Sequence, residues 1–434
     1  MSRRILIQKA ARIEGNANMV IEVAEGRIKT ARFMVQDFRG FEKFMQGKQI
    51  ELAPHLISRI CGLCSVSHQV AGFQAIEKAL HLEVPGSVQR LRDIALLGET
   101  ISSHSLSYFF LTMPDMLGGA KGIFDLMKLH PETARDAFLL KKLGSRIVEI
   151  ICRRTVHPIS LSVGQILIPP SQGDLDEIRK IATNVKELSL KLIRRFEGLE
   201  IKNRNIAFPE NHRINFLTME EKSGQQFLRV FDRTGKTIEE FLPKQFDDNI
   251  AELRVDWSFA KFPYLKNLGF PEGILVVGPL ARLFHDDSVL TDPDLKGLKL
   301  TEILRDPMAR HLDDIDICRL LEIFSISKRI LRYLENVDLS MLKGVAPDLQ
   351  VSARGIGIVE APRGILVHSY VINRGSVENL RLLVATQFNN AYINLMLKDL
   401  GDRHIDGDKL SKAGEDLLAR CVRMFDPCLT CATH

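Results

Sequence analysis

Two cysteine pairs carry the strongest chemical signal in this sequence. Cys61 and Cys64 enclose two residues, and Cys428 and Cys431 repeat the same spacing far along the chain. A CxxC turn directs both side chains toward one point, so two such turns can supply four sulfurs to one site. Soft thiolates bind zinc, iron–sulfur clusters or another thiophilic metal. A four-sulfur metal site is therefore the leading prediction.

Spacing alone leaves three kinds of site open: structural zinc, a catalytic metal, and redox-active dithiols. Ribbon-type zinc sites usually keep their pairs about 15–20 residues apart, whereas several hundred residues separate Cys64 from Cys428. A structural zinc ion would then link distant parts of the chain, which is an unusual use of zinc. Three further cysteines are isolated and are interpreted as core thiols, because free cysteine packs as a small hydrophobic residue. They are Cys152, Cys318 and Cys421.

Helices are expected to position most of the site. Apolar residues recur at helical spacing over about 65–200, 300–340 and 376–425. Prolines interrupt the first run at Pro114, Pro131, Pro169 and Pro170. The first cysteine pair directly precedes this run, and a helix N-terminus stabilises a thiolate and lowers its pKa.

Shorter stretches alternate apolar and polar residues and predict antiparallel β units. The first covers about 5–35, with a turn at Glu25–Gly26. The second is a hairpin over 213–245, with Thr234–Gly235 near its turn, and the third covers 349–373. The pattern as a whole predicts a mostly helical body with small β units attached.

Composition excludes some classes of function. The chain has 434 residues, 45% hydrophobic and 26% charged, with a formal net charge of only +5. These values are ordinary for a globular protein, and no long basic run suggests nucleic acid as a partner. The start, Met1-Ser-Arg-Arg, leads into an alternating segment without an apolar core, so we expect no secretory signal. The sequence has no uninterrupted apolar run of about 18 residues, so we expect no transmembrane helix.

Both cysteine segments resemble the signatures of nickel–iron hydrogenase large subunits. The first is RICGLCSVSH, which ends at His68, and the second is DPCLTCATH, which ends at His434. The similarity continues through the middle of the chain and displaces structural zinc as an interpretation. It implies that all four sulfurs bind nickel. Cys61 and Cys428 would be terminal ligands, whereas Cys64 and Cys431 would bridge to an iron that carries CO and two cyanide ligands.

The resemblance also gives roles to residues that look unremarkable alone. Glu42 in RGFE would otherwise be a surface-loop carboxylate. The family implies that it holds a magnesium or iron ion together with His434 and the backbone carbonyl of Leu382. Oxygen ligands with one imidazole suit a hard or borderline cation.

Glu14 in RIEG would otherwise be a solvated carboxylate beside an arginine. The resemblance implies that it passes protons between Cys428 and the exterior. Asn16 stands where the family often has histidine, so any role of that histidine is missing here.

Arg363 in EAPRG would otherwise lie in a turn at a strand end. By resemblance it lies over the open face of the metal pair and acts in polarising H2. Pro362 and Thr386 would contact the cyanides of the iron, Thr386 by a hydrogen bond. Ala385 replaces a proline that many relatives have before this threonine.

Three histidines are interpreted as supporting residues and not as metal ligands. His68 is expected to donate a hydrogen bond to a bridging sulfur. For His104 and His157, a satisfied buried histidine explains the sequence at least as well as a catalytic part. Ser103 stands where the family often has aspartate, so one carboxylate near the metals is absent.

The fold expected from all this is α+β and mainly α. A bundle of long helices would be flanked by small antiparallel β units, with both chain ends converging on a buried metal site. Length alone allows two or three domains, but a site shared by both ends favours a single integrated body over 1–434. Its β-rich pieces would cover about 1–50, 213–260 and 345–375.

The function implied is reversible heterolytic cleavage of H2 to protons and electrons. Since the chain has no cysteines to spare for an iron–sulfur cluster, electrons would pass to an iron–sulfur small subunit. Further electron-transfer subunits, carrying flavin or iron–sulfur clusters, are expected as well. Segments such as WSFAKFPYLKNLG look closest to the cytoplasmic multi-subunit branch, which couples H2 to NAD, a deazaflavin or a heterodisulfide reductase.

Two other functions remain in view at this stage. One is a hydrogen-sensing regulatory hydrogenase with the same metals and low turnover. The other is a non-catalytic respiratory-complex relative, a class that typically loses the cysteines retained here. The family also implies maturation partners, namely nickel-insertion proteins and a protease that removes a C-terminal extension. The encoded precursor is accordingly expected to be longer than the 434 residues printed.

Overall fold

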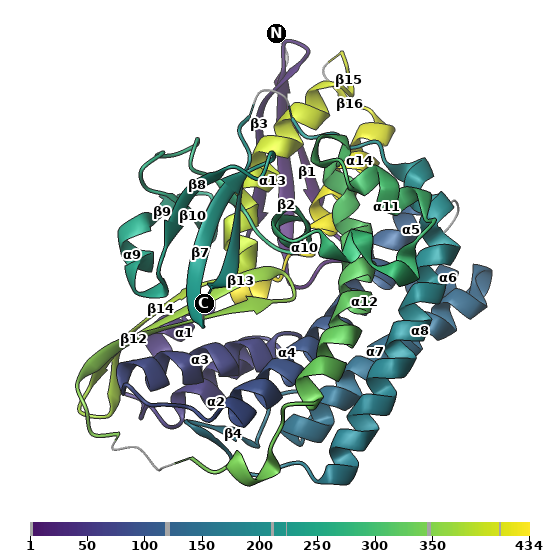
Figure 1. The fold of residues 1–434 in the computed structure, drawn as a ribbon. Helices are drawn as coiled ribbons and strands as arrows, with labels where there is room; N and C mark the ends of the chain where they lie inside the picture. The colour runs from purple at the N-terminus through teal and green to yellow at the C-terminus, as the bar shows by residue number, and fades with distance from the viewer. Residues whose placement is uncertain (1–2, 118–121, 210–211, 223, 345–348, 408) are drawn as a thin grey trace.

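A computed structural model describes residues 3–117, 122–209, 212–222, 224–344, 349–407 and 409–434. Most of the long helices lie in the lower and right-hand part of Figure 1, and most of the β-sheets lie above and to the left of them. This arrangement confirms the predicted α+β class. Within the described ranges, every helix is too short or too polar to span a lipid bilayer.

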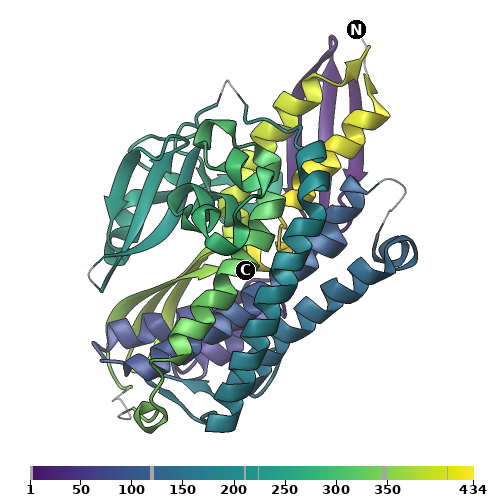
Figure 2. The same cartoon turned by 45° about the vertical axis from the view of Figure 1, so that its right-hand side comes forward.

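The long helices form the main body of the molecule. They are α3 (Ser65–Ala79), α4 (Gly86–Leu106), α7 (Pro131–Cys152), α8 (Gln172–Asn203), α12 (Ile315–Leu334), α13 (Ala385–Asp402) and α14 (Lys412–Met424). Local sequence explains where several of them begin. Pro131 occupies the first turn of α7, and Ser171 with Asp174 forms a capping box at the start of α8. Figure 2 shows α7 and α8 running side by side.

Short helices connect these elements. They are α1 (Phe41–Phe44), α2 (Ala53–Ile57), α5 (Met113–Met116), α6 (Ile123–Leu129), α9 (Phe246–Asn249), α10 (Pro279–His285), α11 (Lys299–Leu304) and α15 (Leu429–Ala432). A π-helical segment, 107–112, continues α4 toward α5. Pro114 lies in the first turn of α5, directly after this segment.

The strands form small sheets, most of them antiparallel. The first sheet has β1 (Arg3–Lys9), β2 (Ala17–Ala24) and β3 (Arg27–Val35). A second has the order β11-β6-β7-β8, from β6 (Asn215–Lys222), β7 (Gln225–Asp232), β8 (Thr237–Phe241) and β11 (Leu275–Val276). A third has β12 (Ala353–Ala361), β13 (Gly364–Asn373) and β14 (Ser376–Leu383). The pairs are β4 (Leu161–Ser162) with β5 (Gln165–Ile166), β9 (Ile250–Val255) with β10 (Ser258–Leu265), and β15 (Ile405–Asp406) with β16 (Lys409–Leu410).

Two expectations about the strands were wrong. Residues 376–383 were predicted as the start of a helical run, but they form β14, which pairs with β13. The region 213–245 was predicted as one hairpin, yet it makes three strands, because a second turn joins β6 to β7. The turn near Thr234–Gly235 joins β7 to β8 as expected, since Asp232 accepts hydrogen bonds from the turn.

Helix α3 and strand β12 pack at unusually close range. A Cβ built on Gly357 would lie 1.9 Å from the carbonyl oxygen of Ala71, and one on Gly355 would lie 1.9 Å from that of Ala75. Only glycine permits this approach of strand backbone to helix backbone. The contact brings the segment after β12 next to the helix that begins at Cys64.

Residues from both ends of the chain meet in the middle of the molecule. Glu14 makes an isolated β-bridge with Cys428, and the Arg39 N–H donates to the carbonyl of Thr433 at 2.9 Å. The first sheet packs on α13, where the side chain of Asn394 accepts a hydrogen bond from the Phe33 N–H. These contacts bring the buried cysteine segments of both chain ends together.

Candidate metal centre

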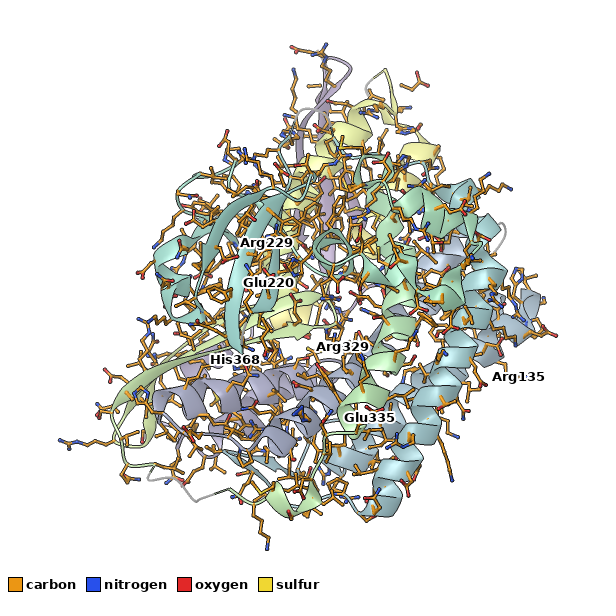
Figure 3. The ribbon with its side chains drawn as sticks, in the orientation of Figure 1. Arg135, Glu220, Arg229, Arg329, Glu335 and His368 are labelled. Carbon is orange, nitrogen blue, oxygen red and sulfur yellow. The ribbon has the colours of Figure 1, made fainter. Side chains whose placement is uncertain are left out.

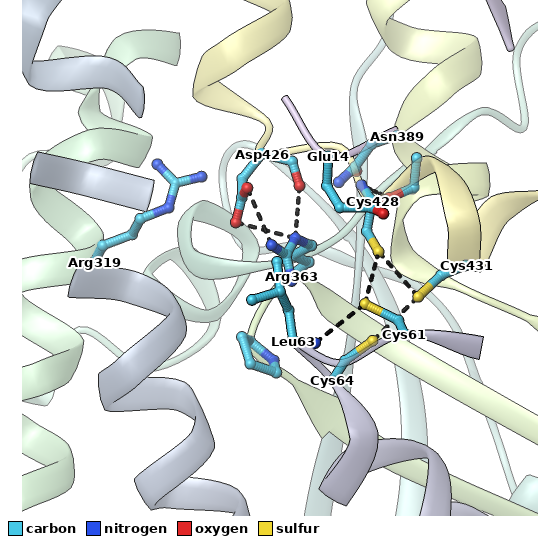
Figure 4. A network of polar contacts seen from close by, with 12 residues as sticks. Glu14, Cys61, Leu63, Cys64, Arg319, Arg363, Asn389, Asp426, Cys428 and Cys431 are labelled. Carbon is cyan, nitrogen blue, oxygen red and sulfur yellow. Dashed lines mark hydrogen bonds and ion pairs between the residues drawn. The ribbon is translucent and has the colours of Figure 1, made fainter. Parts of the chain in front are cut away.

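The four cysteine sulfurs lie together in the interior. The Sγ atoms of Cys64 and Cys431 are 3.1 Å apart, those of Cys428 and Cys431 are 3.0 Å apart, and those of Cys61 and Cys428 are 3.4 Å apart. All four side chains are buried and none forms a disulfide. All four sulfurs lie within 4.8 Å of one another (Figure 4). Among the described residues, no other group of three or more metal-ligating side chains converges in this way.

Local structure directs each sulfur inward. Cys64 is the residue before α3, and Cys428 is the extended residue before α15. The Leu63 N–H donates to the Cys61 sulfur at 3.3 Å, and the Cys428 N–H donates to Oγ1 of Thr386 at 2.9 Å. The sulfurs are therefore held by turns and by the residues that precede helix starts.

The electrostatics of the cluster suit a soft cation. Hydrogen bonds from the thiols of Cys428, Cys431 and Cys64 lower the pKa of Cys61 far below its usual range. Burial raises the pKa of Cys431. Four buried thiolates this close would repel one another, so full ionisation requires a bound cation. The donor set thus fits a thiophilic metal.

A small cavity of about 30 Å³ adjoins three of the four sulfurs. Its lining includes Cys64, Cys431, Pro362, Arg363 and Thr386. A space of this size accepts only very small ligands, such as a water molecule or a diatomic group. The structure thus places Pro362, Arg363 and Thr386 around the same cavity as Cys64, Cys428 and Cys431.

The Arg363 guanidinium is anchored on one side and free on the other. Its Nε lies 2.7 Å from the carbonyl oxygen of Asp426 and 3.0 Å from the carboxylate of that residue (Figure 4). Its Nη1 is buried without a hydrogen-bond partner. The charges of Asp426, Cys428 and Cys64 raise the pKa of Arg363 against the effect of burial. Arg363 is therefore a fixed cation beside the sulfurs, with one N–H group available.

Glu14 is connected to Cys428 through a threonine. Its carboxylate accepts hydrogen bonds from the Thr430 hydroxyl at 2.8 Å and from the Thr430 N–H at 3.1 Å. The same hydroxyl lies 3.8 Å from the Cys428 sulfur. Sequence reasoning named Glu14 but missed Thr430, although that residue lies between the two cysteines of the second pair.

Glu42, His434 and Leu382 also lie close together, next to Cys431. The Glu42 carboxylate accepts the Leu382 N–H at 2.8 Å and lies 3.5 Å from Nε2 of His434. His434 Nδ1 lies 2.7 Å from the carbonyl oxygen of Cys431. The ammonium of Lys261 is 3.6 Å from the same carboxylate. Burial opposes ionisation of Glu42, but His434 and Lys261 outweigh it and lower the pKa.

The histidines near the site differ from some expectations. His68 Nδ1 lies 3.0 Å from Nε2 of His368, a partner that sequence reasoning missed, and burial lowers the pKa of His68 to about 4. Among the described hydrogen bonds, His68 makes none to sulfur, so the expected contact with a bridging sulfur is not seen. His104 is a buried, satisfied histidine, 2.6 Å from Glu322. His157 donates its N–H to Ser65 at 3.1 Å.

Glu99 is a further buried group that the sequence did not single out. Its carboxylate accepts the N–H groups of Val66 and Ser67 at 2.8 and 3.0 Å, in the first turn of α3. Burial raises the pKa of Glu99 to about 7. Glu99 thus completes the hydrogen bonding of the helix start directly after Cys64.

A much larger polar cavity, about 720 Å³, is bordered by the end of β12 at Glu360 and Ala361. Figure 3 labels Glu220 and Arg229 on the sheet side of this cavity and Arg329 on α12. Ala361 lines both this cavity and the small one at the sulfurs. The two cavities therefore approach each other at Ala361.

The chain resembles known hydrogenase subunits along nearly its whole length. Residues 39–129 and 210–434 match the family described as nickel-dependent hydrogenase. The sequence is 31% identical to one of the subunits of the F420-non-reducing hydrogenase of Methanothermobacter marburgensis, over 99% of this chain and 94% of that protein. It is 27% identical to the NAD-reducing hydrogenase HoxS subunit beta of Cupriavidus necator, over 100% of this chain and 95% of that protein.

Solved structures show the same similarity. The fold superimposes on an NAD+-reducing nickel–iron hydrogenase crystallised in the H2-reduced state, with a TM-score of 0.88 and 27% identity. That comparison covers 100% of both chains.

Proposed function

Because the chain belongs to the nickel-dependent hydrogenase family, we propose that it is a large subunit that cleaves H2 reversibly into protons and electrons. The observation that carries this proposal is the cluster of four buried cysteine sulfurs within 4.8 Å of one another. Both CxxC pairs contribute to it. When bound there, a nickel–iron pair supplies the electrophilic centre at which H2 is polarised and split.

Cys61 and Cys428 would hold nickel alone, and Cys64 and Cys431 would hold nickel and iron together. The small cavity is lined by Cys64 and Cys431, the two proposed bridging residues, and also by Cys428. Its volume of about 30 Å³ suits the CO and cyanide ligands proposed for the iron. Pro362 would contact these ligands, and the Thr386 hydroxyl would donate a hydrogen bond to one of them while accepting the Cys428 N–H.

Side chains around the cluster would stabilise developing charge and transfer protons. The free Nη1 of Arg363 is positioned to stabilise negative charge that develops beside the sulfurs. A proton on the Cys428 sulfur would pass to the Thr430 hydroxyl and then to Glu14, along contacts of 3.8 and 2.8 Å. A carboxylate at the end of such a chain can act as a general acid and base.

Glu42, His434 and the Leu382 carbonyl would hold a magnesium or iron ion. The contact between the Glu42 carboxylate and the His434 imidazole supports this assignment, since both groups suit such a cation, and the Leu382 N–H donates to the same carboxylate. The Lys261 ammonium would share the charge of Glu42 with the ion.

Electrons would leave through an iron–sulfur small subunit. Within the described residues, the four cysteines are the only group of three or more His, Cys, Asp or Glu side chains whose ligand atoms lie close enough to hold a metal ion. Exposed apolar side chains lie beside the first cysteine pair, and Val156 is 3.5 Å from a Cβ built on Gly62. Val156 is 39% exposed, and its exposed neighbours include Ile159, Leu167 and Ile168. Exposed apolar groups that gather in this way favour a protein interface.

Relatives support further proposals about context. One relative is named as NAD-reducing, so we propose a cytoplasmic, multi-subunit enzyme with additional flavin or iron–sulfur electron-transfer subunits. Maturation by nickel-insertion proteins and a protease is proposed on the family resemblance. We also propose a single integrated body, since the larger of two hydrophobic core clusters includes residues from Ala10 to Ala432. A hydrogen sensor with the same metals would differ in turnover, and the four retained cysteines argue against a non-catalytic relative.

An infrared spectrum of the purified enzyme tests the central proposal. Bands from CO and cyanide bound to iron are expected, together with one nickel per chain by metal analysis. Nickel without these bands would remove the iron ligands from the proposal. Zinc in place of nickel would overturn the proposed function altogether.

A further inference from the structure

The Pro362–Arg363 peptide forms the link between two strands. Ala361 pairs with Gly364, so β12 and β13 are joined by a turn of only these two residues. Arg363 therefore takes its direction from a short, sharply bent piece of backbone. The carbonyl oxygens of Ala361 and Pro362 belong to this turn and need hydrogen-bond donors, because the surrounding protein is largely buried.

Arg282 supplies both of those donors. This residue belongs to α10, and its guanidinium donates to the carbonyl of Ala361 at 3.2 Å and to that of Pro362 at 3.0 Å. The same guanidinium donates to Glu360, the neighbouring residue of β12, at 3.0 Å. One side chain thus binds three consecutive residues directly before Arg363.

The remaining N–H groups of Arg282 bind Glu322 on α12. The two contacts measure 2.6 and 2.8 Å and form a bidentate pair. All five N–H donors of Arg282 are therefore used, and a lysine could not reproduce this planar fork. Glu322 is held in turn by His104 of α4 at 2.6 Å. Burial opposes the charge of Glu322, but Arg282 and His104 lower its pKa.

The backbone before Arg282 supports the same turn. A Cβ on Gly278 would lie 2.6 Å from the carbonyl oxygen of Arg363, so the start of α10 packs directly on that residue. Asn389 of α13 fixes Val277 by accepting its N–H at 2.9 Å. The segment 277–282 is therefore held in place and packs against the Pro362–Arg363 turn on the side of the large cavity.

From these contacts we propose that Arg282 is a positioning residue for the H2 reaction. It holds the Pro362–Arg363 turn so that the free Nη1 of Arg363 faces the sulfur cluster. Arg282 touches neither the sulfurs nor the small cavity, and it acts only through Arg363 and Pro362. The inference rests on the proposed role of Arg363, and the test separates the two.

A double-mutant cycle on the purified hydrogenase provides that test. Arg282→Lys is expected to keep its nickel and to lose roughly 100-fold in H2 turnover, since small displacements of a catalytic group have such effects. Arg363→Lys alone should also slow turnover. The double variant should be no slower than the slower single variant, because both changes disable the same group. A residue with a merely structural role would instead add its own loss.

Arg204→Lys is the matched control. Arg204 also forms a bidentate pair with a carboxylate, Asp314, at 2.6 and 2.9 Å, and donates to the carbonyl of Ala309. It lies away from the Arg363 turn, so nickel content and turnover should be unchanged.

Three results would overturn the inference. They are wild-type turnover in Arg282→Lys, losses that multiply in the double variant, or nickel loss in both Arg282→Lys and Glu322→Asp while Arg204→Lys retains the metal. The last result would assign Arg282 to assembly. Wild-type turnover in Arg363→Lys would instead refute the proposed role of Arg363 itself.

Discussion

At the scale of single residues, the four cysteines differ from the other three in their surroundings. We predict that Cys→Ser at positions 61, 64, 428 or 431 abolishes nickel retention, because a hydroxyl is a harder and less acidic ligand than a thiol. H2 turnover should fall to background in each variant. Metal analysis of the purified protein measures the effect.

Cys421→Ala serves as the control for these variants. Cys421 is buried and unpaired but lies outside the sulfur cluster, so its variant should retain nickel and activity. Full nickel content in any one of the four serine variants would contradict the four-sulfur site.

The contact between Glu14 and Thr430 predicts how two substitutions change the rate of hydrogen–deuterium exchange. Glu14→Gln removes the titratable proton while keeping the shape, and hydrogen–deuterium exchange should fall by roughly 100-fold or more. Thr430→Val removes only the hydroxyl that lies between Glu14 and Cys428, so a smaller loss is expected. Nickel content should stay unchanged in both. Normal exchange in Thr430→Val with slow exchange in Glu14→Gln would place another group between sulfur and carboxylate.

Sequence patterns located the cysteines because CxxC spacing is local, and the family resemblance supplied Glu14 and Arg363. Thr430, Glu99 and Arg282 could not be found in the same way. Their roles depend on contacts with residues far away in the sequence, such as Glu99 with Val66 and Arg282 with Pro362. Only the position of Thr430 between two ligating cysteines could have served as a signal.

At the scale of elements, the close packing of α3 on β12 should be sensitive to a single methyl group. Gly357→Ala would put a Cβ 1.9 Å from the Ala71 carbonyl, which forces helix and strand apart. We predict a loss of about 1–3 kcal/mol of stability, as for other overpacked interiors. The thermal midpoint of the purified protein measures it.

Gly86→Ala is the comparison for this change, because no heavy atom lies within 4 Å of a Cβ built there. Its thermal midpoint should remain close to that of the wild type. Equal midpoints for both alanine variants would show that α3 and β12 have room to separate.

Glu200 links α8 to its neighbours and predicts a pH dependence. Burial, followed by the charge of Asp316, raises its pKa from 4.5 to about 8, and Tyr108 donates a hydrogen bond to it. The folded protein therefore binds an extra proton between these pH values. Stability should fall as the pH rises from 4.5 to 8, by on the order of a few kcal/mol at most.

Glu200→Gln should flatten this dependence, because the amide does not titrate. Glu187→Gln, an exposed position on the same helix, should keep the wild-type slope. Thermal midpoints at pH 5 and pH 8 for the three proteins decide the matter. An unchanged slope in Glu200→Gln would mean that other groups control the transition.

Helices were predictable where apolar residues recur at helical spacing over a long stretch. A strand was missed where pairing with a distant strand, and not local sequence, determines the structure. Long helices such as α8 followed from apolar residues at helical spacing. Strand β14 was missed because its sequence, SVENLRLL, contains strong helix formers. Pairing with β13 overrides that preference, and the turn at Arg374–Gly375, where both residues have positive φ, was the signal for a hairpin.

At the scale of the whole molecule, the metal should tie distant parts of the chain together. Removing nickel leaves four crowded thiols without a cation, so the segments 60–65 and 426–434 should separate from each other. Hydrogen exchange followed by mass spectrometry should rise in these segments and in the Arg363 turn. Peptides from α8 should exchange as in the intact enzyme, and a uniform rise along the chain would contradict this picture.

The joining of both cysteine pairs in one cluster has a consequence for how the protein is made. A ribosome releases the first pair long before it synthesises the second, by roughly 20–70 seconds at ~5–20 residues per second. Throughout that interval the nascent chain offers two sulfurs, and no complete site exists to receive the metal. A chain whose translation stops early therefore exposes its unpaired thiols and never becomes catalytically competent. The position of the two pairs thus makes metal loading report that synthesis has passed Cys431.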